Sequence, residues 1–166
     1  MFSIACSKQV NIGIITRKNS RPQISSVYDV NEHIKTEEST KGGKVHRFAG
    51  PALAFYYENG MKMEKRWYIG GNFHRFTGPA QTFYYENGVK MKERWYISGK
   101  PHRLNGPALT FYYKNGTKEV EKWYEHGKPH RLSGPALTSY YKNGIKREER
   151  WYENGKQARP SGSATT

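Results

Sequence analysis

The sequence has few of the residues that would support a disulfide framework or a membrane span. Its 166 residues include one cysteine, Cys6, so no intrachain disulfide can form and a reducing compartment is expected. No apolar run is long enough to span a bilayer, and the opening MFSIACSKQV lacks the layout of a signal peptide. We therefore expect a protein of the cytoplasm, or of a virus particle assembled there, that is neither secreted nor transmembrane.

Hydrophobic residues are also scarce. They make up 35% of the chain, and the mean hydropathy is −0.95, which is low for a domain with a thick core. Aromatic residues account for 14%, with 13 Tyr and 4 Trp that keep polar groups. Much of the buried surface must therefore be aromatic.

The dipeptide His-Arg recurs every 28 residues, which reveals an internal repeat. Each unit reads H-R-x-x-G-P-A, three variable residues, Tyr-Tyr-x-Asn-Gly, a charged run, and Trp-Tyr-x-x-Gly. A fixed period of this length is typical of an array in which each unit packs against its neighbours. The recurring histidines are His46, His74, His102 and His130.

The two ends of the array contain diverged copies of the unit, as capping repeats often do. Residues 1–17 match no repeat and could be an edge strand (Ile12 to Thr16), an arm or disorder. The predicted organisation is a segment outside the repeats at 1–17, a degenerate capping repeat at 18–45, four full repeats at 46–157, and a truncated repeat with a tail at 158–166.

The Asn-Gly pair of each unit, flanked by alternating residues, predicts a β-hairpin with a two-residue type I′ turn. In the third repeat the strands would be about Pro107 to Tyr113 and Thr117 to Tyr124, followed by a loop to the next hairpin. The sequence thus predicts an all-β fold of tandem β-hairpins in an elongated, single-layer, twisted antiparallel sheet.

Counting outward from a two-residue turn assigns side chains to the two faces of the sheet. Tyr56 would oppose Met63, and Ala52 would oppose Trp67. This face, with a small alanine beside each tryptophan, is interpreted as structural packing. Its tryptophans are Trp67, Trp95, Trp123 and Trp151.

The opposite face combines aromatic residues with two cations per unit. Tyr57 would oppose Lys62, Phe55 would oppose Glu64 and Leu53 would oppose Arg66. The face could be a solvated surface in which Lys and Arg stems cover rings, or it could be a binding surface. Its candidate interaction residues are Lys62, Arg66, Lys90, Arg94, Lys118, Lys122, Lys146, Arg150, Phe55, Phe83 and Phe111.

The order of these motifs resembles the MORN repeat, in the variant form of bacterial, phage and large-DNA-virus proteins. The resemblance spans roughly residues 41–164 and includes Trp-Tyr, the GKPH of Gly99 to His102, and Tyr-Tyr-x-Asn-Gly. The unit here is longer than the usual repeat, and arginine follows each histidine where the family often has glycine. The resemblance implies two strands per repeat and a scaffold that dimerises through its sheet or, in some members, associates with acidic phospholipids.

The recurring histidines are not expected to form a catalytic or metal site. No Ser, Cys or Asp recurs with them, and the one aspartate is Asp29. Equivalent histidines would lie about 10 Å apart, too far to share a zinc ion. A structural role is expected, for example a hydrogen bond from the imidazole to a backbone carbonyl. We expect a protein that is not an enzyme and has no cofactor or metal.

The net charge of +14 favours a negatively charged partner. The leading hypothesis is a scaffold that binds an acidic protein surface, as a viral assembly or minor capsid component. The alternatives are sequence-independent binding of nucleic acid, association with an anionic membrane, and a homodimer. Regular glutamates in the second strands favour protein contact over a nucleic-acid groove. The diverged ends, including the RKNSRP of Arg17 to Pro22, predict capped edges and no open-ended polymer.

Overall fold

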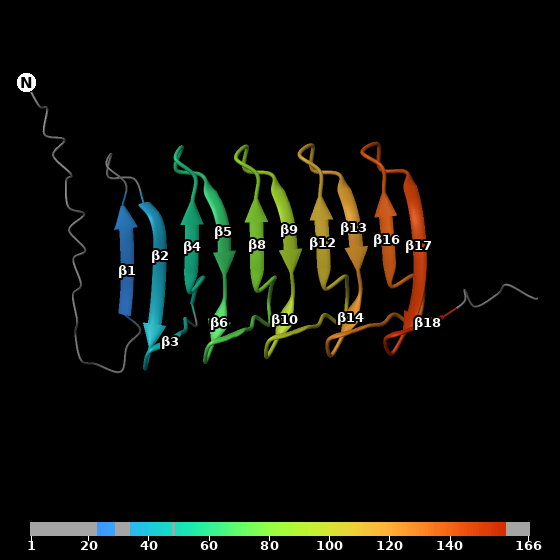
Figure 1. The fold of residues 1–166 in the computed structure, drawn as a ribbon, viewed down its shortest axis with the longest axis horizontal. Helices are drawn as coiled ribbons and strands as arrows, with labels where there is room; N and C mark the ends of the chain where they lie inside the picture. Colours follow the sequence, from blue (N-terminus) through green and yellow to red (C-terminus); the bar gives the residue numbers. More distant parts are fainter. Residues whose placement is uncertain (1–22, 29–33, 48, 159–166) are drawn as a thin grey trace, which may run out of the picture.

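The structure is a computed structural model that describes residues 23–28, 34–47 and 49–158. Successive hairpins lie side by side in one elongated antiparallel sheet of 12 strands (Figure 1). The described ranges contain no helix. They therefore contain no helix that could cross a bilayer. The prediction of an all-β fold of tandem β-hairpins is confirmed. The segment 1–17 and residues 159–166 lie outside the described residues, as does the predicted RKNSRP cap.

The main sheet contains two long strands from each repeat. Its strands are β1 (Gln23–Tyr28), β2 (Ile34–Lys41), β4 (Leu53–Tyr56), β5 (Lys62–Arg66), β8 (Gln81–Tyr84), β9 (Lys90–Arg94), β12 (Leu109–Tyr112), β13 (Lys118–Lys122), β16 (Leu137–Tyr140) and β17 (Lys146–Glu153). They follow one another in chain order, so each hairpin pairs with the hairpins before and after it. Two further strands complete the sheet, β3 (Lys44–Val45) beside β2 and β18 (Lys156–Ala158) beside β17.

The inner register of each hairpin agrees with the prediction. Leu53 pairs with Arg66 and Phe55 pairs with Glu64, and the same pairs recur in later repeats. The turn itself differs. The Tyr57 N–H donates to the Met61 carbonyl at 2.8 Å, and the Gly60 N–H donates to the Tyr57 carbonyl at 3.0 Å. The loop therefore has three residues.

The predicted type I′ turn at Asn-Gly is wrong because only its glycine has a positive φ, +78° at Gly60. A three-residue loop combines a type I turn with a left-handed glycine. The Asn59 side-chain oxygen accepts the Met61 N–H at 2.9 Å, which stabilises this loop. A register shift follows, so Tyr56 opposes Lys62 and not Met63.

The chain between two long hairpins forms a second, smaller hairpin where a plain loop was expected. These hairpins pair β6 (Tyr68–Ile69) with β7 (Asn72–Phe73), β10 (Tyr96–Ile97) with β11 (Lys100–Pro101), and β14 (Tyr124–Glu125) with β15 (Lys128–Pro129). Their two turn residues both have positive φ, for example +48° at His126 and +86° at Gly127. The turn with two residues of positive φ thus occurs in the small hairpin, at the residue pair that ends in glycine, and not at Asn-Gly. The predicted second strand from Thr117 to Tyr124 is therefore divided at Trp123 into β13 and β14, whereas in the last full repeat β17 continues to Glu153.

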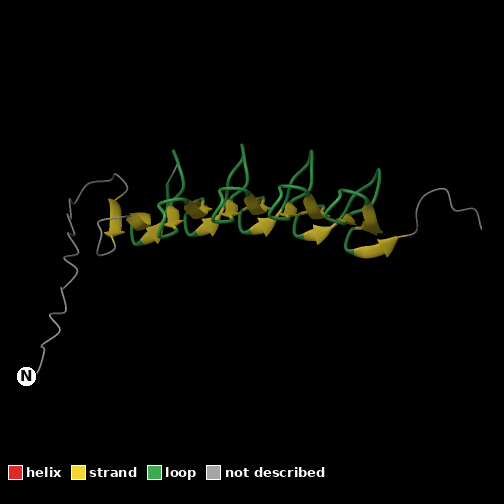
Figure 2. Ribbon diagram, turned by 90° about the horizontal axis from the view of Figure 1, so that it is seen from above, coloured by secondary structure: helices red, strands yellow, loops and turns green. Residues whose placement is uncertain are grey.

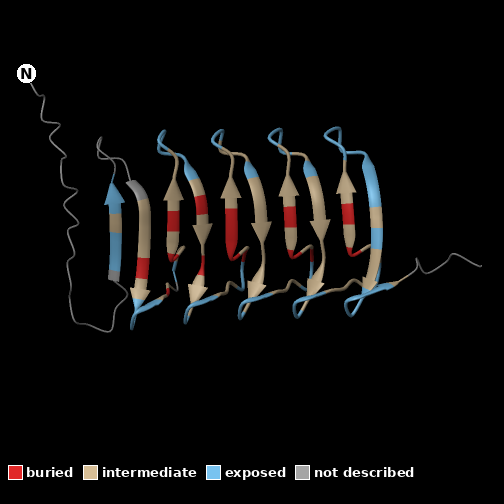
Figure 3. Cartoon of the chain, viewed as in Figure 1, coloured by how far each residue is buried: buried red, intermediate tan, exposed pale blue. Residues whose placement is uncertain are grey.

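The two faces of the sheet differ in how they are covered. The tallest loops all rise from one side (Figure 2). We call this side the loop face. The side chains under these loops are the most buried and form a band across the sheet (Figure 3). This band consists of Ala52, Ala54, Ala80, Thr82, Ala108, Thr110, Ala136 and Thr138, with Trp67 beside it.

Residues of the degenerate repeat join the same band. Ser39 of β2 occupies the place of the tryptophan, is 1% exposed, and donates its N–H to the Ala52 carbonyl at 2.7 Å. Its hydroxyl donates to the His46 carbonyl at 3.0 Å. A small hydroxyl side chain therefore ends the tryptophan row at this side of the array.

Candidate interaction surfaces

Each recurring histidine connects two successive repeats on the loop face. The Nδ1 atom of His74 accepts the Ser98 N–H at 3.2 Å, and Nδ1 of His102 accepts the His126 N–H at 3.1 Å. The partner is thus a backbone amide of the next small hairpin, not the carbonyl suggested from the sequence. The Nδ1 atom must carry no hydrogen in order to accept this hydrogen bond. The role of these histidines in the described fold is structural.

Three of the four arginines that follow a histidine, Arg75, Arg103 and Arg131, lie over a tryptophan ring. The guanidinium carbon of Arg75 is 4.1 Å from the Trp67 ring centre, and that of Arg103 is 3.9 Å from the Trp95 ring centre. The Arg103 side chain also donates to the Pro107 carbonyl at 3.3 Å. Burial lowers the pKa of Arg75 from its usual range. In the sequence, this arginine was only a difference from MORN repeats, which often have glycine at that position. In the structure it packs the loop onto the sheet.

The glycine four residues after each histidine makes room for the arginine. A Cβ atom added at Gly106 would lie 2.7 Å from the Arg103 guanidinium carbon. A Cβ added at Gly78 would meet Arg75 at the same distance. The motif H-R-x-x-G-P-A is therefore a packing unit: arginine stacks on tryptophan, and glycine lets the loop close over it.

Large apolar side chains project from the same loops. Phe76 is 74% exposed, Leu104 is 71% exposed and Leu132 is 79% exposed. Each directly follows one of the stacked arginines. Sequence reasoning missed them, although the apolar residue after every His-Arg was a visible signal.

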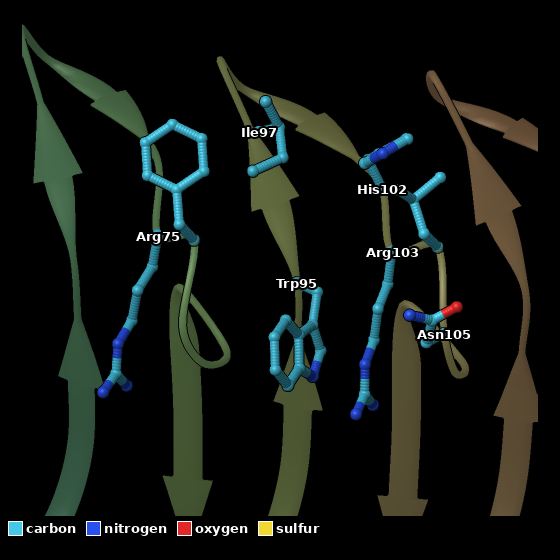
Figure 4. Close-up of a pocket in the computed structure, with 8 residues that line it drawn as sticks. Arg75, Trp95, Ile97, His102, Arg103 and Asn105 are labelled. Carbon is cyan, nitrogen blue, oxygen red and sulfur yellow. The ribbon is translucent and has the colours of Figure 1, made fainter.

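Two grooves lie between successive loops. The first, of about 500 Å³, is lined by Arg75 and Phe76 of one loop, Arg103 and Leu104 of the next, and Trp95. Figure 4 shows the Trp95 indole between the side chains of Arg75 and Arg103. The next groove repeats this arrangement between Leu104 and Leu132.

The opposite side of the sheet, which we call the open face, has no second layer over it in the described structure. It consists of two rows across the strands. One row contains Leu53, Arg66, Gln81, Arg94, Leu109, Lys122, Leu137 and Arg150. The other contains Phe55, Glu64, Phe83, Lys92, Phe111, Val120, Ser139 and Glu148. Apolar and charged side chains thus alternate along most of both rows.

Cations of the open face lie against its aromatic rings. The Lys92 Nζ is 5.1 Å from the Phe83 ring centre and 4.9 Å from that of Phe111. The Arg66 guanidinium is 5.0 Å from the Phe55 ring centre. Burial, with Arg94 close by, lowers the pKa of Lys92. The hydrogen bond with Glu64 raises the pKa of Arg66.

The structure brings only part of the predicted interaction surface together. On the open face it places Phe55, Phe83, Phe111, Arg66, Arg94, Lys122 and Arg150. The prediction that Lys62, Lys90, Lys118 and Lys146 share this face is wrong, because the register shift moves them beside the first tyrosine of each repeat. Lys92, which the prediction omitted, lies at the centre of the face.

Three of the four displaced lysines, Lys90, Lys118 and Lys146, belong to a polar network on the loop face. Lys118 forms an ion pair with Glu121 at 2.6 Å, and Glu121 also accepts the Tyr140 hydroxyl at 2.6 Å. Burial and the Glu121 hydrogen bond raise the pKa of Tyr140 to about 12. The network connects one repeat to the next and pairs these lysines with carboxylates, whereas Lys92 has no ion pair among the described residues.

No group of three or more His, Cys, Asp and Glu side chains placed to hold a metal ion occurs in the described ranges. Comparison of the chain with family models, curated proteins and solved structures found no match. The resemblance to MORN repeats therefore stays a prediction based on sequence motifs. Function has to be argued from the two faces of the sheet.

Proposed function

We propose that the protein is a non-enzymatic scaffold that binds an acidic protein surface through the open face. Charge and aromatic content on this face support the proposal. Phe83 and Phe111 offer apolar area that a partner can bury, and the cations between them favour carboxylates. The resemblance to viral and phage repeats supports assembly, or a minor capsid component, as the setting of such binding.

The observation that carries the proposal is the position of Lys92 and Lys122. The cations nearer the ends of the face, Arg66 and Arg150, form ion pairs with neighbouring glutamates. Among the described residues, no carboxylate forms an ion pair with Lys92 or Lys122. A partner carboxylate would compensate the cost that burial imposes on the charged form of Lys92.

A pull-down from the native source tests this proposal against nucleic-acid and membrane binding. The tagged chain would be incubated with lysate, with and without nuclease, and washed at about 0.3 M salt, where exposed charges are strongly screened. Retention of an acidic protein after nuclease treatment is the expected result, because apolar burial by Phe83 and Phe111 is not screened. Loss of all bound material with nuclease would contradict it and favour nucleic-acid binding. Retention of anionic lipid alone would favour a peripheral membrane module.

A further inference from the structure

The loops of the loop face expose large apolar side chains, and we call each exposed side chain with its loop a ridge. Phe76, Leu104 and Leu132 are the most exposed large apolar residues in the described ranges. Each ridge is held in place, because the preceding arginine is stacked on a tryptophan and bonded to a proline carbonyl. These side chains are therefore displayed on a rigid base.

The two grooves between these ridges have the same plan but different polarity. Trp95 and Ile97 line the first groove, and no carboxylate lines it. In the second groove Trp123 replaces Trp95, and Glu125 stands in the place of Ile97. Arginines line both grooves. A ligand would thus find two slots in a positively charged surface, the first lined mainly by apolar groups and the second by polar and apolar groups in similar measure.

The spacing of the grooves limits the conformation of a ligand that fills both. Adjacent repeats are two strands apart, which is about 9.6 Å. A polyproline II helix rises about 9.3 Å in three residues and returns every third side chain to the same side. An extended β-strand returns side chains to one side at about 6.7 Å and 13 Å, which fits neither groove spacing nor its multiple.

We propose that the loop face binds a polyproline II segment that has an apolar residue at every third position and acidic residues between. One apolar side chain enters each groove between two of the exposed ridge side chains, beside the tryptophan on which an arginine is stacked. The acidic residues lie near Arg75, Arg103 and Arg131. Aromatic-lined grooves are a known mode of recognising this conformation, because its backbone is ordered before binding. The surface is distinct from the open face, so the two proposals stand independently.

The probe for this proposal is a fluorescein-labelled peptide of four Leu-Pro-Glu triplets, titrated with the full chain by fluorescence anisotropy. One control peptide has the same composition with leucines two and four residues apart. A second control is an α-helical peptide with leucine at every seventh residue, about 10.5 Å apart, and the same net charge. We expect saturable binding of the triplet peptide and at least tenfold weaker binding of both controls.

Protein variants identify the surface that the peptide uses. Leu104→Ser removes the ridge common to both grooves, and we expect it to weaken binding of the triplet peptide about tenfold, since the apolar area that Leu104 would bury against the peptide is lost. Ile145→Ser is the matched control, because Ile145 is 62% exposed at the far end of a hairpin. Both side chains are exposed, so near-ultraviolet circular dichroism should be unchanged.

Three results would overturn the proposal. They are no anisotropy change up to about 1 mM protein, tighter binding of the helical peptide, or equal weakening by Leu104→Ser and Ile145→Ser. The variant Lys92→Ala/Lys122→Ala should bind the triplet peptide as the unaltered chain does. A failure of the loop-face proposal can therefore be distinguished from a failure of the open-face proposal.

Discussion

At the scale of single residues, the motif H-R-x-x-G-P-A is explained by packing. The arginine gains a tryptophan face and a carbonyl acceptor, and the glycine leaves space for the guanidinium. Such a cation–π contact contributes about 0.5–2 kcal/mol, and a hydrogen bond of this kind about 0.5–1.5 kcal/mol. These contacts recur in successive repeats. Their modest free-energy contributions therefore add up, which matters for a thin sheet with a small core.

Substituting either the arginine or the glycine of this motif should destabilise the fold. Arg103→Ala is expected to lower the free energy of unfolding by about 1–3 kcal/mol, through loss of stacking and of the Pro107 bond. Gly106→Ala should have a similar effect because its Cβ would contact the guanidinium. Urea denaturation followed by tryptophan fluorescence measures both, with Lys142→Ala as an exposed control. An Arg103→Ala midpoint equal to that of the control would contradict the packing role.

The tyrosine–glutamate pairs predict how stability depends on alkaline pH. Burial and hydrogen bonds to Glu121 and Glu37 raise the pKa values of Tyr140 and Tyr56 to about 12, from 10.0. Between these values the unfolded chain releases protons that the folded chain retains, so stability should fall as pH rises through this window. Phenolate absorbance should show some of the 13 tyrosines titrating late in the folded chain. Tyr140→Phe should remove one late group, and uniform titration near pH 10 would contradict the pairs.

At the scale of elements, the Asn-Gly turn shows where sequence reasoning was sufficient and where it was not. Alternation around the turn predicted the Phe55–Glu64 pairing correctly. Asn-Gly is compatible with a two-residue and a three-residue loop, and the sequence pattern alone did not distinguish them. Contacts between repeats favour the longer loop, since the Asn87 side chain donates to the Lys114 carbonyl of the next turn at 3.3 Å. That one-residue difference moved four lysines to the other face.

The small hairpins were missed for a related reason. Their x-Gly pairs were in the sequence, but strands of two residues carry too little alternation to predict. Their stability comes from stacking, as when the Gly127 N–H donates to the Pro101 carbonyl at 2.9 Å. The grooves and exposed ridges depend on the same stacking and could not be predicted from one repeat alone.

The turn type can be tested with a proline. In a type I turn Lys114 is the first central residue, a position that favours proline, and its N–H donates no hydrogen bond between backbone groups in the described turns. Lys114→Pro should therefore leave the free energy of unfolding, measured by urea denaturation, unchanged or raise it by up to about 1 kcal/mol. In a two-residue turn Lys114 would be a strand residue, and proline would destabilise the hairpin. A large loss of stability would thus contradict the three-residue loop.

At the scale of the whole molecule, residues 34–158 form an array in which the hydrogen bonds described between repeats join adjacent units. The histidine, tyrosine and small-hairpin contacts all join adjacent repeats. Stability in such arrays is approximately a sum of units and interfaces. A whole unit should therefore be removable without loss of the fold.

Excision of residues 103–130 joins His102 to Arg131 and restores the His-Arg pair. We expect a folded protein with native-like near-ultraviolet circular dichroism and a lower urea midpoint, since one interface is lost. Excision of residues 103–116, half a unit, is the control and should not fold, because it breaks the strand register. An unfolded product from the full-unit excision would contradict the array.

The most direct test of the open-face proposal compares two variants with the same change in net charge. Lys92→Ala/Lys122→Ala removes cations from the open face, and Lys90→Ala/Lys118→Ala removes cations of the loop face from the same two strands. Each removed ion pair of the second variant contributes about 0–1 kcal/mol, so both variants should fold. Quantified capture of the acidic partner at about 0.3 M salt should be lost in the first variant and retained in the second. Equal loss in both would contradict the account, because net charge alone would then explain binding.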